Sequence, residues 1–161
     1  MTDIIDSMID ACDDFLKVEQ AIVSGLNFRG RTLLEWEDFL KLPPISDKIS
    51  QPELVLFNLK YIEINECIMS NLAYAKSLYD VSYAQYKNTY RLTQNEIIES
   101  YNQQNKKISI EFINQYASSK CSKLFYVVKI NEIFYNFWTV YKDKLNLLDS
   151  RLSNLSFLMR N

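Results

Sequence analysis

The sequence predicts an all-α protein, in which a long antiparallel, coiled-coil-like helical hairpin follows a shorter N-terminal helical segment. Two observations lead to this prediction. Both Gly and all three Pro of the 161 residues lie before residue 53, so the 109 residues from Glu53 to Asn161 lack the usual interruptions of helices. Apolar residues also recur at helical spacing along that stretch. An all-β fold would need many more turn residues than this chain has.

The second helix of the hairpin is predicted from a row of positions spaced alternately three and four residues apart. Thirteen of its fifteen positions are apolar or aromatic, which is typical of a coiled-coil seam. The two polar positions, Lys120 and Asn131, either face solvent or fix the register of the helix pair. This heptad row consists of Ile110, Ile113, Ala117, Lys120, Leu124, Val127, Asn131, Phe134, Trp138, Tyr141, Leu145, Leu148, Leu152, Leu155 and Met159.

The first helix of the hairpin is predicted over residues 53–92. Ser50 is followed three residues later by Glu53, which is the spacing of a capping box at a helix start. A second match at residues 93–96 marks a break or a kink of the helix, and the polar stretch 102–107 is the other candidate turn. We therefore expect the two helices to be joined between residues 92 and 108.

The N-terminal third has its own helix signals. A first helix is predicted over residues 2–25, followed by a loop over 25–30. Thr32 and Glu35 form a third capping-box match and predict a short helix over 33–40.

Two adjacent prolines, Pro43 and Pro44, end that short helix, and residues 41–51 are predicted to be a linker. The chain is thus predicted to have two parts, an acidic helical segment with its linker at 1–51 and the hairpin at 52–161.

Charge is divided unevenly along the chain. Residues 1–66 hold 13 acids and 6 bases, a net charge of −7, whereas residues 67–161 hold 7 acids and 12 bases, a net charge of +5. Basic faces are typical of proteins that bind nucleic acid or acidic partners. Alternatively, the acidic segment packs on the basic hairpin and neutralises it.

Aromatic and basic residues alternate in the hairpin. Tyr79, Tyr83, Tyr86 and Tyr90 follow helical spacing, so they either stack on bases or pack in the helix interface. The first hypothesis is that this protein is a non-enzymatic accessory protein that binds single-stranded DNA through the hairpin. Its candidate binding residues are Lys76, Tyr83, Lys87, Tyr90, Arg91, Lys106, Lys107, Lys120, Lys123 and Arg151.

The acidic first helix suggests a different class of function. A row of acids there could mimic nucleic acid and occupy a basic groove, as a phage-type inhibitor of a host-defence protein such as a CRISPR nuclease, or as an adaptor. The candidate partner-binding residues are Asp3, Asp6, Asp10, Asp13 and Asp14. A structural assembly protein that oligomerises through the heptad row is the third hypothesis.

Catalysis and cofactors find little support in the composition. The chain has no His, and its three cysteines, Cys12, Cys67 and Cys121, are far apart. Two Gly cannot form a glycine-rich phosphate loop. We expect no enzymatic activity, no metal and no cofactor.

The location follows from what the sequence lacks. No basic start with an apolar run precedes the first helix, and no stretch reaches the roughly 18 apolar residues of a membrane span. The spaced cysteines fit reduced thiols rather than a disulfide framework. A cytoplasmic protein that does not bind membranes is expected.

The segment Leu145–Leu155, with Asp149, Ser150 and Arg151 in its middle, resembles the C-terminal helix of small phage helical proteins of the T4-type recombination mediator family. The resemblance covers the hairpin. It implies a homo-oligomer that binds single-stranded DNA and helps to load a recombinase during recombination or replication.

Overall fold

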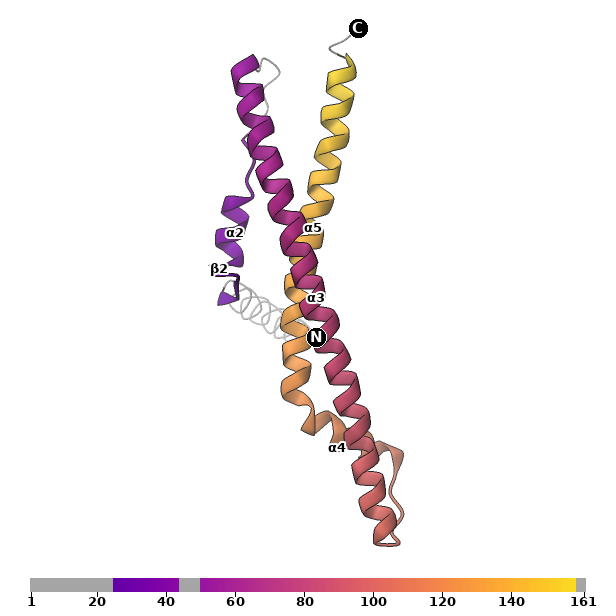
Figure 1. The fold of residues 1–161 in the computed structure, drawn as a ribbon. Coiled ribbons are helices and arrows are strands. Elements are labelled where there is room, and N and C mark those ends of the chain that lie inside the picture. The colour runs from indigo at the N-terminus through magenta and orange to yellow at the C-terminus, as the bar shows by residue number, and fades with distance from the viewer. Residues whose placement is uncertain (1–24, 44–49, 159–161) are drawn as a thin grey trace, which may run out of the picture. The chain divides into compact units, whose positions relative to one another are not determined.

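The computed structural model describes residues 25–43 and 50–158, with side chains to residue 150 (Figure 1). The chain forms two compact units, Met1–Ile64 and Asn65–Asn161. The elements in order are β1 Asn27–Phe28, β2 Arg31–Thr32, α2 Leu33–Phe39, α3 Gln51–Gln103, α4 Ile110–Lys120 and α5 Ser122–Leu158. The helix α3 begins in the first unit and continues into the second.

A tight β-hairpin lies in the first unit at the position where the sequence predicts a loop. Strands β1 and β2 pair antiparallel with Asn27 opposite Thr32. The two residues between them, Arg29 and Gly30, have φ values of 50° and 86°, as a type I′ turn requires. The Gly30 N–H donates to Asn27 Oδ1 at 2.9 Å and closes the turn.

The short helix α2 starts at the predicted capping box. The Glu35 N–H donates to Thr32 Oγ1 at 3.2 Å, and the Thr32 N–H donates to Glu35 Oε2 at 2.7 Å. Trp36 Nε1–H then donates to the Phe28 carbonyl at 2.8 Å, which attaches the β-hairpin to the helix. The prediction of a helix over residues 33–40 is confirmed.

Aromatic rings and cations connect the elements of the first unit. The Arg31 guanidinium lies 4.7 Å from the ring centre of Phe39 and the Lys60 ammonium lies 4.4 Å from it. Lys60 belongs to α3, so Phe39 links β2, α2 and the first turns of α3. The α3 start is confirmed as well, because the Ser50 N–H donates to Glu53 Oε2 at 2.8 Å.

The second unit is a helical hairpin in which α3 runs antiparallel to α4 and α5. Tyr86 contacts Phe125 with ring centres 5.7 Å apart, and Tyr79 stacks on Tyr135 at 6.0 Å. Lower numbers on α3 thus meet higher numbers on α5, as Figure 1 shows along the magenta and orange ribbons. The predicted fold class, all-α with a long antiparallel hairpin, is confirmed, with the two-residue strands as the exception among the described residues.

The hairpin turn occupies residues 104–109, so it overlaps the polar stretch 102–107 that was one of the two candidates. Asn105 has φ 53°, and the Lys106 N–H donates to the Tyr101 carbonyl at 3.0 Å while the Asn105 N–H donates to Asn102. These two bonds form a Schellman motif, with Asn in the left-handed position that Gly usually takes. Ser109 Oγ then caps α4.

The other candidate break, at residues 91–96, is wrong, because α3 continues through it. Thr93 is buried, and its hydroxyl donates to the carbonyl of Thr89 at 2.9 Å. A threonine bonded back to its own helix caps nothing, so the capping-box spacing is without effect here.

The second long helix is interrupted once. α4 ends at Lys120 and α5 begins at Ser122, with the Cys121 N–H donating to the carbonyls of Ala117 and Ser119. At this interruption the buried positions lie one residue later than in the predicted heptad row, since Cys121 and Val128 are buried. The predicted members Lys120 and Val127 are exposed instead. Placing Cys121 rather than Lys120 in the interface avoids burying a cation.

The remainder of the heptad row mostly packs as predicted. Ile113, Ala117, Phe134, Trp138 and Leu145 are buried, whereas the first member, Ile110, is exposed. The division of the chain at residues 51 and 52 stays a prediction. The helix predicted over residues 2–25 lies outside the described residues, apart from its last position.

Candidate nucleic-acid interface

The tyrosine row of α3 belongs largely to the helix interface. Tyr79 stacks between Tyr83 and Tyr135, with ring centres 5.8 and 6.0 Å away. Tyr86 lies between Tyr90 and Phe125 at 5.8 and 5.7 Å. Rings held in this way stabilise the hairpin.

Two further observations fix the roles of individual tyrosines. Burial, followed by the proximity of Tyr90, raises the pKa of Tyr86. The Tyr90 hydroxyl donates to the Asn114 carbonyl at 3.4 Å, across the hairpin. Tyr83 differs from these two, because its side chain is 39% exposed.

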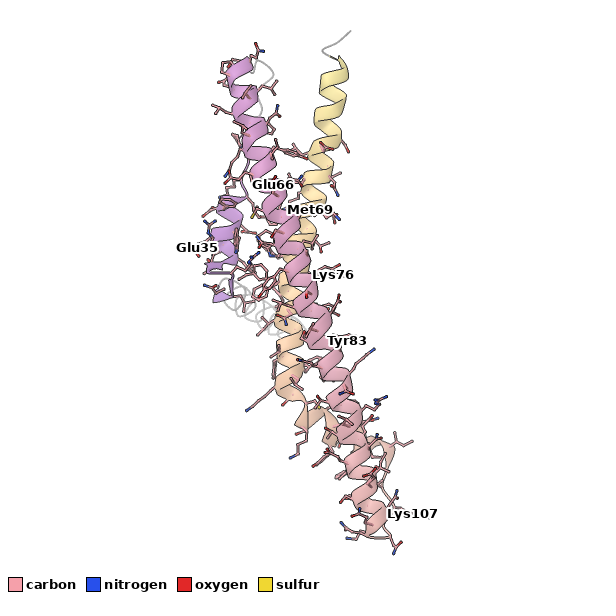
Figure 2. The ribbon with its side chains drawn as sticks, viewed as in Figure 1. Glu35, Glu66, Met69, Lys76, Tyr83 and Lys107 are labelled. Atoms are coloured by element: carbon pink, nitrogen blue, oxygen red, sulfur yellow. The ribbon has the colours of Figure 1, made fainter. Side chains whose placement is uncertain are left out.

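A row of exposed side chains runs along α3 beside these rings. Lys76, Tyr83, Lys87 and Arg91 are spaced by seven, four and four residues, so they lie within an arc of about 80° on the helix. We call these four residues the basic face. The Lys87 ammonium lies 4.6 Å from the ring centre of Tyr83. Figure 2 shows Lys76 and Tyr83 in succession along α3. Asp80 is the acid on the same side of the helix.

The other predicted residues lie elsewhere on the hairpin. Lys106 and Lys107 are in the turn that follows α3, and Figure 2 shows Lys107 far from Tyr83. Lys106 Nζ donates to Gln104 Oε1 at 2.9 Å. Lys120 and Lys123 flank Cys121, whose sulfur lies 4.0 Å from Thr93 Oγ1, so they lie near the level of Arg91.

The structure does not describe the side chains of the remaining candidate residues. Arg151 lies in α5, beyond the residues whose side chains are described. The five acids of the alternative partner site, at positions 3, 6, 10, 13 and 14, lie outside the described residues. That site stays a prediction.

Phe125 is a candidate that the sequence patterns did not reveal. Its ring is 42% exposed on α5, contacts Tyr86, and has the Lys129 ammonium 5.6 Å from its centre. A hydrogen bond from Lys129 to Glu132 at 2.7 Å raises the pKa of Lys129.

A repeated sequence signal could have identified this pair. An aromatic residue is followed by a lysine four residues later at Tyr83–Lys87, Tyr116–Lys120, Phe125–Lys129 and Trp138–Lys142. In the first three of these four pairs the helix places the cation over the ring, at 4.6, 5.5 and 5.6 Å.

Two classes of site find no support in the part of the chain that is described. None of its helices combines the length and the apolarity needed to cross a membrane. Within the same residues, no three His, Cys, Asp or Glu side chains are grouped as a metal ion would need.

Compared with protein-family models, with curated proteins and with solved structures, the chain matches none of them. The resemblance to recombination mediators therefore stays a prediction, and the function is inferred from the charges and the exposed ring of the basic face.

Proposed function

We propose that this protein is a non-enzymatic accessory protein that binds single-stranded DNA through the basic face of its hairpin. The observation that carries the proposal is the Lys87 ammonium above the exposed ring of Tyr83, between Lys76 and Arg91. The cations would contact phosphates. A base would stack on the side of the Tyr83 ring that Lys87 covers, after the Lys87 ammonium moves from the ring to a phosphate, because Tyr79 already stacks on Tyr83.

The charge of the hairpin favours a single strand over a duplex. Residues 67–161 have a net charge of +5, and Asp80 reduces the charge of the basic face itself. Non-specific duplex binding depends almost wholly on phosphate neutralisation, whereas single-strand binding adds stacking on aromatic rings. A modestly charged face with an exposed tyrosine suits the second mode. The phage-type role in recombination or replication is part of the same proposal.

Fluorescence anisotropy with a labelled oligodeoxythymidine, measured over a series of salt concentrations, tests this function. We expect the logarithm of the association constant to fall linearly with the logarithm of salt concentration. Replacing Lys76, Lys87 and Arg91 together by alanine should reduce the slope by about 2, because each cation contacts one phosphate.

The stacking role is tested separately. Tyr83→Ala should weaken binding about tenfold or more with an unchanged salt slope. Tyr74→Ala is the matched control, since Tyr74 is similarly exposed but lies on another side of α3. Absence of binding at low salt, or binding that salt does not weaken, would refute the proposal.

A further inference from the structure

A second apolar row runs along α5, on the side away from α3. It consists of Tyr126, Ile130, Ile133, Phe137, Val140, Lys144 and Leu147, spaced alternately four and three residues apart. We call it the outer row. Tyr126 and Leu147 are 67% and 66% exposed, Val140 is 50% exposed, and only Ile133 and Phe137 are half-buried.

The spacing of the outer row indicates the shape of the partner surface that can pack on it. A repeat of 3.5 residues keeps the side chains in line along one edge of a supercoiled helix, so the matching surface is another helix. The row spans 22 residues, or about 33 Å of helix. Exposed apolar surfaces of this extent on soluble proteins usually mark contact sites.

We propose that the outer row is a homodimer interface, in which the α5 helices of two copies pack antiparallel about a two-fold axis near Asn136. The charges that flank the row point to this arrangement. Lys129 and Asp143 lie beside the row at equivalent heptad positions, each seven residues from Asn136. In an antiparallel pair, Lys129 of one copy, whose ammonium binds Glu132 of its own chain at 2.7 Å, also meets Asp143 of the other copy, and the symmetry repeats this contact.

The antiparallel register that pairs Lys129 with Asp143 also matches the side chains of the outer row with one another across the interface. Ile130 packs on Val140 of the second copy and Ile133 packs on Phe137. Lys144 meets Tyr126, so the one charged member of the row faces an aromatic ring, as it already does within the chain, where its ammonium lies 4.4 Å from Tyr141.

A parallel pair lacks these matches. It would place Lys144 against Lys144 in the interface, and it would set Asp143 beside Leu148, with no ion pair at either flank. Asp143 forms none of the ion pairs among the described residues, which leaves its carboxylate available to a second copy.

Sedimentation equilibrium on the full chain, without nucleic acid, tests the interface. We expect a dimer, and Ile130→Glu with Val140→Glu should weaken dimerisation about a hundredfold or more, because both carboxylates would be buried without a partner. Far-UV circular dichroism should show unchanged helix content. Val81→Glu is the control, since Val81 is exposed on α3 outside the row and its variant should remain dimeric.

A charge exchange tests the antiparallel orientation. Lys129→Glu or Asp143→Lys alone should weaken the dimer about tenfold, and the two together should restore it. A monomer at all concentrations, a dimer indifferent to the outer-row variants, or an exchange that fails to restore affinity would overturn the proposal. So would a monomer that dimerises only after removal of residues 1–24, since the chain's own N-terminal segment would then cover the row.

Discussion

The Asn131 side chain donates from Nδ2 to the main-chain carbonyl of Leu78 at 3.3 Å, connecting α5 to α3 across 53 positions of sequence. Asn131 occupies a position of the heptad row that is otherwise filled by apolar residues. A polar group at such a site favours a register in which its side chain finds a hydrogen-bond partner, because leaving it unpaired in the interface costs free energy. Of the two sequence-based interpretations of Asn131, this contact favours the fixing of register.

Asn131→Ala should lower the free energy of unfolding by about 1 kcal/mol, which is the usual loss for one partly buried hydrogen bond. Urea denaturation followed by circular dichroism measures the change. Asn146→Ala is the matched control, because Asn146 is exposed on the same helix outside the outer row and its loss should change stability by less than about 0.5 kcal/mol. Equal effects of the two substitutions would contradict the register role.

The fold followed from the sequence because its main signals are local. The positions of Gly and Pro predicted the long helices, and the capping boxes at Thr32 and Ser50 predicted two helix starts. The same capping-box spacing at Thr93 does not mark a helix start, because the Thr93 hydroxyl is bonded to the Thr89 carbonyl within α3. The sequence alone does not show that bond. The one-residue shift to Cys121 also depends on packing against α3, which a spacing pattern does not contain.

Trp138 is a fully buried side chain of the hairpin, with none of its surface exposed. Trp138→Ala should lower the free energy of unfolding by about 3–5 kcal/mol, because the cavity adds to the lost burial. Thermal and urea unfolding measure the loss. Asn146→Ala, at an exposed position of the same helix, should stay within about 0.5 kcal/mol of the unchanged protein. A small effect at Trp138 would show that the hairpin is packed differently.

Glu35 should titrate below its ordinary value of 4.5, because the Thr32 N–H and then the Thr32 hydroxyl donate to its carboxylate and lower its pKa. A lowered folded-state pKa means that this carboxylate stabilises the fold above pH 4.5. The contribution is lost as the pH falls through the folded-state pKa.

The Thr32 amide resonance in NMR spectra reports this titration, since its N–H donates to Glu35 at 2.7 Å. Glu35→Gln should abolish the acid-induced shift of that amide, and Glu37→Gln should leave it in place. Thr32→Ala should move the pKa of Glu35 back toward 4.5. A midpoint above 4.5 would show that the capping box is not formed.

The candidate site could be predicted only in part. Lys76, Tyr83, Lys87 and Arg91 share a helix face because helical spacing is regular, and the sequence contains that regularity. The same pattern could not separate Tyr83 from Tyr86 and Tyr90, whose rings differ by their contacts with Phe125 and Asn114 on the opposite helices. Exposure depends on such partners, so the aromatic–lysine spacing at Phe125 does not by itself show that its ring is exposed.

Gly30 occupies the second position of the type I′ turn with φ 86°, where an L-residue with a side chain is strained. Gly30→Ala should lower the stability of the first unit by about 1–2 kcal/mol. Gly30→Asn should lower it less, because Asn tolerates the left-handed region better.

Fluorescence of Trp36 during urea unfolding measures this effect, with Trp138→Phe as the background so that Trp36 is the only tryptophan. Trp36 is a suitable probe because its Nε1–H donates to Phe28, at the end of the strand that enters the turn. Gly25→Ala is the control, since its φ lies outside the left-handed region and an added methyl group meets no atom within 4 Å. If both alanine variants were equally stable, the turn would not have the positive φ that Gly30 shows.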